Sequence, residues 1–386
     1  MKTVYLDNNA TTRVAPEVRE AMDPFFTDLW GNPSSMHFFG GQVRQHVDRA
    51  RQQVAALLNA DPSEILFTSC GTESDNTAIR GAAQAAGDRV SIVTSRVEHP
   101  AVLGPCRYAA ERGHRLFEVG VDAEGQLDPV QLGEALRYGP SVTSLMWANN
   151  ETGVIFPVPQ IVESVKAASG IFHTDAVQAV GKLPIDVKRV PVDLLSLSGH
   201  KLHAPKGIGA LYIRKGTRIQ PFMLGGHQED NRRAGTENVP YIVGLGAACE
   251  LALKDMAGET ARMAALRDRL EAGIRASCPD SKVNGSRKQR LPNTLNVSLE
   301  YIEGESILYM LSDAGIAASS GSACTSGSLE PSHVLRAMGV PFTSVHGSIR
   351  FSLSRYTTVE EIDYTLQVLP GIVKRLREIS PFAKGR

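Results

Sequence analysis

The feature that most constrains the fold is an alternation of short apolar segments with helix-like segments through the middle of the chain. Residues 41–59 place valine and leucine on one face at 3.6-residue spacing, which predicts a helix, and further helices are expected over residues 73–86 and 157–168. Short apolar runs bounded by polar residues or glycine predict strands at Glu64–Thr68, Val90–Thr94, Val142–Trp147, Ile171–Thr174, Leu194–Leu197 and Gly209–Ile213. Strands that alternate with helices indicate a mostly parallel sheet with helices on both faces, an α/β fold.

The pattern changes after about residue 245. A long helix is predicted over 251–276, followed by strands and helices in mixed order: Thr294–Leu299, Glu305–Ala314, Ser348–Leu353 and Val359–Ile379. We therefore expect two domains, a large α/β domain over residues 14–250 and a smaller α+β domain made of residues 1–13 and 251–386.

Composition excludes several classes of protein. The 386 residues suffice for two domains, and 42% hydrophobic with 21% charged residues is the balance of a globular protein. Basic and acidic residues number 41 each, so no net charge favours nucleic acid or an anionic membrane as a partner. The N-terminus lacks the basic-then-apolar layout of a signal peptide, and no apolar run would span a bilayer, so a cytoplasmic location is expected.

Cysteine and histidine spacing gives no framework or metal signature. The five cysteines are widely spaced without a CxxC pair, which excludes a disulfide framework or a structural zinc site. His200 and His203 lack a third ligand at a useful spacing, so no metal is expected.

Polar clusters follow the predicted strands, and ligands of open α/β sheets bind at the carboxyl ends of strands. That five separate strands each end in such a cluster predicts a binding site there. The clusters are Ser69–Thr72, Glu98–Pro100, Asn149–Gly153, His173–Asp175 and Ser198–Lys201.

Each cluster carries a chemical interpretation beside a plainer one. Gly71 and Thr72 enter a helix, whose free N–H groups would bind a phosphate, although an ordinary helix with Thr72 as its N-cap has the same pattern. Lys201 follows an apolar strand, where desolvation would free its amine for Schiff-base chemistry; the alternative is an exposed turn lysine. Asp175 would pair with a cationic ring nitrogen, or would cap a helix over residues 176–180.

Three further side chains complete the set of candidates. His99 precedes Pro100, which is well placed to begin a helix, and His99 could stack on a flat ring or move protons. Cys324 lies in the Ser/Gly-rich stretch 319–328, where a thiol would be accessible and reactive rather than a chance linker residue. Arg350 could grip a carboxylate with two hydrogen bonds, or could be a surface arginine.

Together these motifs resemble the cysteine desulfurases of the class V aminotransferase family, which are fold-type I pyridoxal-phosphate enzymes. The resemblance is to the nitrogen-fixation (NifS-like) type and covers nearly the whole chain. Its most specific pieces are Tyr5–Thr12, His173–Gln178, Leu197–Lys201, Arg233–Asn238 and Ser319–Ser328.

The resemblance implies a role for each matching residue. Lys201 would bind pyridoxal phosphate covalently, with Asp175 at the ring nitrogen, Gln178 at the ring hydroxyl and His99 stacked on the ring. The residues that would hold the phosphate are Gly71, Thr72, Ser198 and His200, with Thr236 from the second subunit of a homodimer. Asn150 would contact the cofactor and, with Arg350, the substrate carboxylate, whereas Cys324 would accept the sulfur. Cys70 is expected near the phosphate without a catalytic role.

The implied activity is the conversion of L-cysteine to L-alanine with a persulfide left on Cys324. The implied acceptor of the sulfur is an iron–sulfur scaffold protein that serves nitrogenase maturation. Four alternatives remain open: a selenocysteine lyase, an aminotransferase, a sulfur carrier without enzymatic activity, and a thiol acyltransferase. An aminotransferase has no use for a loop thiol, a carrier does not explain Lys201 and Asp175, and an acyltransferase does not explain a phosphate site.

Overall fold

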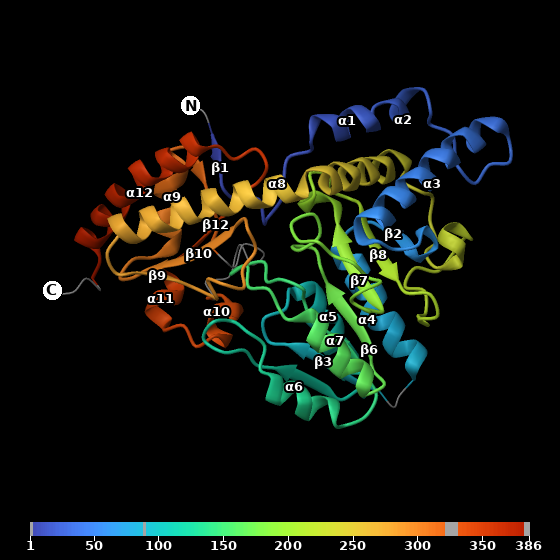
Figure 1. The fold of residues 1–386 in the computed structure, drawn as a ribbon, viewed down its shortest axis with the longest axis horizontal. Coiled ribbons are helices and arrows are strands. Elements are labelled where there is room, and N and C mark those ends of the chain that lie inside the picture. The colour runs from blue at the N-terminus through green and yellow to red at the C-terminus, as the bar shows by residue number, and fades with distance from the viewer. Residues whose placement is uncertain (1–2, 88–89, 321–330, 382–386) are drawn as a thin grey trace.

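The computed structural model describes residues 3–87, 90–320 and 331–381 of the chain. Its largest element is a seven-stranded sheet in the order β2-β8-β7-β6-β5-β3-β4 (Figure 1). Only β8 runs against its neighbours, so the sheet is mostly parallel, as the sequence predicted. The strands are β2 Ile65–Thr68, β3 Ser91–Ser95, β4 Leu116–Val119, β5 Ser141–Ser144, β6 Ile171–Asp175, β7 Leu194–Ser198 and β8 Gly209–Ile213.

Helices cover both faces of this sheet because successive strand residues point to opposite faces and both sets are apolar. In β2, Leu66 packs with α4 and α5, whereas Ile65 and Phe67 join the core on the other face. The helices of this part are α1 Pro16–Met22, α2 Pro24–Thr27, α3 Phe38–Leu58, α4 Gly71–Ala86, α5 Pro100–Ala110, α6 Pro129–Leu136 and α7 Val158–Ala167.

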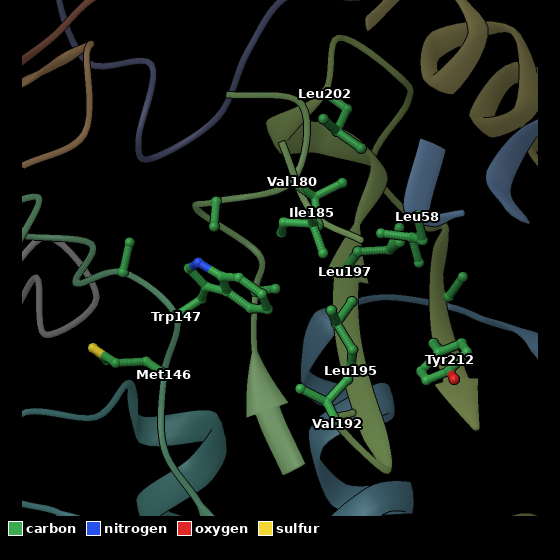
Figure 2. Packing of buried hydrophobic residues seen from close by; sticks show 14 of the residues in the cluster. Leu58, Met146, Trp147, Val180, Ile185, Val192, Leu195, Leu197, Leu202 and Tyr212 are labelled. Atoms are coloured by element: carbon green, nitrogen blue, oxygen red, sulfur yellow. The ribbon is translucent and has the colours of Figure 1, made fainter. Parts of the chain in front are cut away.

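The core on the second face lies close to the carboxyl ends of the central strands. Figure 2 shows its side chains gathered around β7 and β8, and they are almost completely buried. The labelled members are Leu58, Met146, Trp147, Val180, Ile185, Val192, Leu195, Leu197, Leu202 and Tyr212. This packing fixes the strand ends from which the candidate residues project.

A second hydrophobic core lies in the C-terminal part, between a small antiparallel sheet and the helices α8, α9 and α12. Val4 and Leu6 belong to this core, so the N-terminus packs with the C-terminal part. The elements are α8 Val239–Ser277, β9 Ser281–Val283, β10 Thr294–Leu299, α9 Gly304–Asp313, α10 His333–Ala337, α11 Phe342–His346, β12 Ser348–Ser352 and α12 Val359–Ile379, and β1 Val4–Tyr5 pairs with β11 Ile316–Ala317.

Helix α8 runs along both cores, from beside α1 to beside α12 (Figure 1). It begins at Val239, twelve residues before the helix predicted to start at residue 251, and it is continuous across residue 250. The prediction missed the first turns because Gly244 and Gly246 are poor helix formers. Both positions are closely packed, since a Cβ on Gly244 would lie 2.7 Å from Met22 Sδ and one on Gly246 would lie 2.7 Å from Ala50 Cα. The domain boundary at residues 250 and 251 stays a prediction.

Among the described residues, no helix combines the length and the apolar character needed to cross a bilayer. The predicted strand Val142–Trp147 ends earlier, at Ser144. Beyond it the backbone still bonds to β6, since Leu145 N–H donates to His173 at 3.1 Å and Trp147 N–H to Asp175 at 2.8 Å. This path leads directly to the polar segment 149–153.

Candidate active site

A cavity of about 360 Å³ opens at the carboxyl ends of the central strands. It brings together most of the residues predicted from the sequence, namely Gly71, Thr72, His99, Asn150, Asp175, Gln178, Ser198, His200, Lys201 and Arg350. The sequence analysis assigned no role to the remaining lining residues, which are Asn9, Ala10, Cys70, Asp75, Ala101, Met146, Ala148 and Val177. Segments separated by more than 300 residues therefore form one site.

One end of the cavity is formed by the start of α4. The N-cap is Cys70, whose side chain makes no cap hydrogen bond, and the helix begins at Gly71. The prediction that Thr72 caps this helix is therefore wrong, because Thr72 lies inside its first turn. A Cβ on Gly71 would lie 2.9 Å from Val177 Cγ2 and 3.4 Å from Ser198 Cβ, so this turn requires glycine. The backbone N–H groups at the start of a helix attract an anion.

A carboxylate holds this turn in place. Glu73 accepts from the backbone N–H of Ser69 at 2.7 Å, which joins the first turn of α4 to the residue before its N-cap. Its other contact is an ion pair with Arg233, Nε to Oε1 at 2.8 Å. This pair anchors the segment 233–238 beside α4, but Thr236 itself is exposed and does not line the cavity of its own chain.

Lys201 ends the short 3₁₀ helix Gly199–Lys201 that follows β7. Its Nζ donates to the backbone carbonyls of Asn9 at 2.5 Å and Ala10 at 2.7 Å. The side chain is partly buried and points into the cavity wall, so the alternative of an exposed turn lysine is wrong. The N-terminal segment thus positions the amine.

Asp175, at the end of β6, is the buried carboxylate of the site. Its Oδ1 accepts from Val177 N–H at 2.9 Å, and residues 177–179 form a turn, so the alternative of a helix over 176–180 is wrong. Burial raises the pKa of Asp175 to about 6, against the opposing effects of the Val177 N–H and Lys201. A bound cation would restore the ionised form. Gln178, in the same turn, donates from Nε2 to the Asn9 carbonyl at 3.1 Å.

Asp75 is a site residue that the sequence analysis missed. Burial, together with the nearby charge of Asp175, raises its pKa well above the usual value, and Asp75 Oδ1 has no hydrogen-bond partner in the described part of the chain. His173 Nε2 lies 3.6 Å from that oxygen and 2.9 Å from Ser196 Oγ. A signal existed, since Asp75 follows Gly71 by four residues and residues i and i+4 share a helix face.

His99 is the N-cap of α5, and Pro100 begins that helix, as predicted. Its Nδ1 accepts from Ala101 N–H at 3.1 Å, so the proton of the neutral ring is on Nε2. Burial, and then the charge of Lys201, lower the pKa of His99 to about 4. At neutral pH the ring is therefore uncharged, and it lines the cavity.

Arg350 lies on β12 and is 2% exposed, so the alternative of a surface arginine is wrong. Its Nη2 donates to Asp7 Oδ1 at 2.8 Å and its Nη1 to the Asn150 carbonyl at 3.0 Å. Arg350 Nε has no partner in the described part of the chain. The ion pair with Asp7 holds the guanidinium in place, and the guanidinium can still donate hydrogen bonds to a ligand in the cavity.

Cys324 lies outside the described residues, but the chain on each side of that gap is placed. Ser319 bridges to Arg350, with Arg350 N–H donating to the Ser319 carbonyl at 2.6 Å. On the other side, Ser332 Oγ bonds to Glu151, and His333 Nε2 lies 2.9 Å from the Glu98 carbonyl. Both described ends are thus attached to segments that line the cavity.

Comparisons with known proteins agree with this geometry. The Aminotransferase class-V family matches residues 4–365. A cysteine desulfurase of Trichormus azollae is 58% identical over 382 residues, covering 99% of this chain and 96% of the relative. The cysteine desulfurase NifS of Azotobacter vinelandii is 57% identical over 386 residues, and the match covers 100% of this chain and 96% of the relative. A solved NifS-like protein superposes with a TM-score of 0.91 at 39% identity, covering 97% of this chain and 100% of that one.

These matches extend over almost the full length of the chain and confirm the predicted fold class and family. The chain therefore belongs to the Aminotransferase class-V family and, within it, to the NifS-like cysteine desulfurases, which are pyridoxal-phosphate enzymes.

Proposed function

We propose that this chain removes sulfur from L-cysteine, releases L-alanine and holds the sulfur as a persulfide on Cys324. The observation that carries the proposal is the convergence in one cavity of Lys201, the buried carboxylate of Asp175 and the glycine turn at Gly71, with Arg350 facing them from β12. A protein that only carried sulfur on a thiol would need none of these groups.

The cavity fits pyridoxal phosphate on three grounds. Asp175 is a buried carboxylate for which the described residues provide no ion pair within 4.0 Å, and the ring nitrogen would supply one in addition to the nearby charge of Lys201. Ser198 Oγ and Gln178 Oε1 are buried without partners in the described part of the chain, as expected of groups that bind a ligand. Gly71 and Thr72 would receive the phosphate at the start of α4. When bound, the cofactor supplies an aldehyde that captures the substrate amine and an electron sink for its α-carbon.

Protein side chains then move the protons. The amine of Lys201 would be the base that takes the proton from the substrate Cα. His99 presents a neutral ring with its proton on Nε2, which suits stacking on a flat cofactor and handing a proton to or from the substrate thiol. Asp175 would hold the ring nitrogen of the cofactor and, in its ionised form, would keep that nitrogen protonated.

The sulfur-transfer step balances without an external oxidant. The thiolate of Cys324 attacks the sulfur of the bound cysteine, so an S–S bond forms as the Cβ–S bond breaks. The electron pair of the broken bond stays on carbon, and protonation at Cβ, together with return of the proton from Lys201 to Cα, gives L-alanine. The attachment of Ser319 and Ser332 beside the cavity supports this role, because Cys324 follows Ser319 by five residues, and five residues of chain can span at most roughly 18 Å.

Replacement of Arg350 by lysine should raise KM for L-cysteine about ten- to hundred-fold, because a lysine cannot make two parallel hydrogen bonds to a carboxylate. The value of kcat should fall much less than kcat/KM. Steady-state alanine formation at increasing L-cysteine concentration measures both. Arg269→Lys, an exposed arginine outside this cavity, is the control, and an unchanged KM in Arg350→Lys would assign the carboxylate to another residue.

Cofactor affinity should depend on the ionisation of Asp175. Because burial raises its pKa to about 6, this carboxyl is protonated below that pH and cannot pair with the ring nitrogen. Binding to the cofactor-free protein should therefore be strongest above pH 6 and weaken as the pH falls through that value. Fluorescence or absorbance titration from pH 5 to 8 measures the affinity. Asp175→Asn should bind weakly at all these pH values, and a decline that persists in the variant would assign it to another group.

We further propose a homodimer in which Thr236 contacts the cofactor phosphate of the other subunit. Thr236 is exposed, yet the pair of Arg233 and Glu73 holds its segment beside the phosphate turn. Large apolar side chains stand exposed on nearby segments, as expected of a covered interface: Phe26, Trp30, Met36, Phe38 and Leu224. Sedimentation equilibrium tests the oligomeric state, and a monomer that is fully active would contradict the proposal.

The acceptor of the persulfide sulfur is proposed to be an iron–sulfur scaffold protein, in the service of nitrogenase maturation. The 57% identity with the Azotobacter protein named NifS supports this role. Cluster formation on a purified scaffold, with L-cysteine and ferrous iron as substrates, tests it. A scaffold that gains no sulfur from the persulfide would reject that partner.

The most direct test of the whole proposal is spectroscopic. The purified protein should be yellow from bound cofactor, and addition of L-cysteine should produce alanine in equal amount to the sulfur released. A parallel assay with selenocysteine separates a desulfurase from a selenocysteine lyase, which would strongly prefer selenocysteine.

A further inference from the structure

A second, smaller cavity shares the side chain of Lys201 with the cofactor cavity. Its volume is about 50 Å³, enough for a few water molecules. It lies between the 3₁₀ turn of Lys201, the middle of α8 and the segment that follows β12. Its charged and titratable lining residues are Lys182, Lys201, His203, Asp255, Glu259 and Arg355.

The acidic residues of this cavity are already neutralised by arginines. Asp255 pairs with Arg355, at 2.6 Å, and Glu259 pairs with Arg262, at 3.0 Å. His203 is neutral, since burial lowers its pKa to about 4, and its Nδ1 lies 3.0 Å from the Arg13 carbonyl. Among these lining residues, the positive charge of Lys182 has no acid in an ion pair with it.

Lys182 is buried, with 8% of its surface exposed, and its Nζ donates to the Gln178 carbonyl at 3.0 Å. Within the described ranges, no carboxylate lies within 4.0 Å of this amine. Burial, and then the charge of Lys201, lower the pKa of Lys182 to about 7. A buried amine without an acid partner is costly, which calls for a reason other than stability.

Hydrogen bonds link the two amines through the cofactor-binding segment. Lys182 holds the backbone of Gln178, Gln178 Nε2 donates to the Asn9 carbonyl at 3.1 Å, and Lys201 Nζ donates to the same carbonyl at 2.5 Å. The repulsion between the two lysines is mutual, so charge on either disfavours charge on the other.

We propose that Lys182 is a positioning residue whose buried charge favours the uncharged, nucleophilic form of Lys201. A lysine next to a second cationic group is an established way to free an amine for covalent chemistry. The inference rests on the proposed role of Lys201 as the cofactor lysine. Lys182 acts from behind that lysine, on the side of the second cavity, and touches neither cofactor nor substrate.

Two matched variants test the inference without an activity assay. The bond between Lys201 and the cofactor changes its visible absorbance when it gains a proton, so a pH titration of the substrate-free, cofactor-loaded protein gives a midpoint. Lys182→Met removes the charge but keeps the length, and the midpoint should move to higher pH by roughly one unit. Lys182→Arg keeps the charge, and its midpoint should stay within a few tenths of a unit of the wild-type value.

A third variant changes the charge in the opposite direction and is less prone to misfold. Asp255 is partly exposed, and Asp255→Asn leaves Arg355 unneutralised in the same cavity, so the midpoint should move to lower pH. Thermal melting and cofactor content establish that each variant is folded and loaded.

An unchanged midpoint in Lys182→Met, or equal shifts in the methionine and arginine variants, would overturn the inference, because packing rather than charge would then account for Lys182. If Lys182→Met fails to fold, the test is Asp255→Asn. The inference is then overturned if the midpoint of Asp255→Asn is not at a lower pH than that of the wild type. A wild-type protein without a visible absorbance band would reject the proposed function itself. If the wild-type protein has the band but the midpoint does not change in these variants, only the role of Lys182 is rejected.

Discussion

Replacement of Lys201 by alanine should abolish the yellow colour of the protein and lower alanine formation from L-cysteine by about a thousand-fold or more. The amine has two tasks in the proposed function, since it binds the cofactor aldehyde and moves the proton of the substrate Cα, and loss of a positioned base alone costs about 10²- to 10⁴-fold. Absorbance spectra and an alanine assay measure the two effects separately.

The matched control for this variant is Lys206→Ala. Lys206 is an exposed lysine five residues along the same turn, so its loss should leave both colour and activity close to those of the wild type. Borohydride reduction followed by peptide mass mapping should find the cofactor on the peptide with Lys201. A Lys201→Ala protein that keeps its colour and its turnover would place the covalent bond on a different amine.

Replacement of Cys324 by alanine should separate cofactor chemistry from sulfur transfer. The variant should bind the cofactor normally, because none of the groups that line the described cavity is altered. Release of sulfide from L-cysteine in the presence of a reductant should fall to background, since no thiolate remains to attack the substrate sulfur. Sulfide release and the persulfide mass on the 324 peptide are the two measurements.

Cys278→Ala provides the control for loss of a thiol as such. Cys278 is buried in the C-terminal core, and burial raises its pKa, which keeps the thiol protonated and unreactive. This variant should release sulfide at the wild-type rate. Sulfide release that survives in Cys324→Ala would show that another cysteine, or none, receives the sulfur.

Several parts of this molecule follow from local sequence patterns. The mostly parallel sheet was predictable because apolar strands and amphipathic helices have different periods that are visible in short windows. The position of the site was predictable because the polar clusters that end with Thr72, Asp175 and Lys201 each follow a strand, and parallel strands bring their carboxyl ends to one edge. The roles of individual residues came from the resemblance, and they stay predictions until the variants are measured.

Local patterns misplaced features that depend on close packing. The start of α8 was predicted too late because Gly244 and Gly246 weaken a helical pattern, although here they let α8 approach its neighbours closely. Thr72 was predicted as a cap because threonine is common there, but the N-cap is Cys70, two residues earlier, and Glu73 bonds to Ser69 N–H. In both cases the deciding contacts form only in the folded chain, and the preferences of single residues do not encode them.

The sequence by itself determined the fold class and the edge of the sheet that carries the cavity, because both depend on periodicity or on neighbours along the chain. Only the tertiary structure decided that Asp7 holds Arg350, that Asp75 lies beside Asp175, and that Lys182 shares a cavity with Lys201. Those relations join segments far apart along the chain. Their energies depend on burial and distance, and both quantities exist only once the chain has packed.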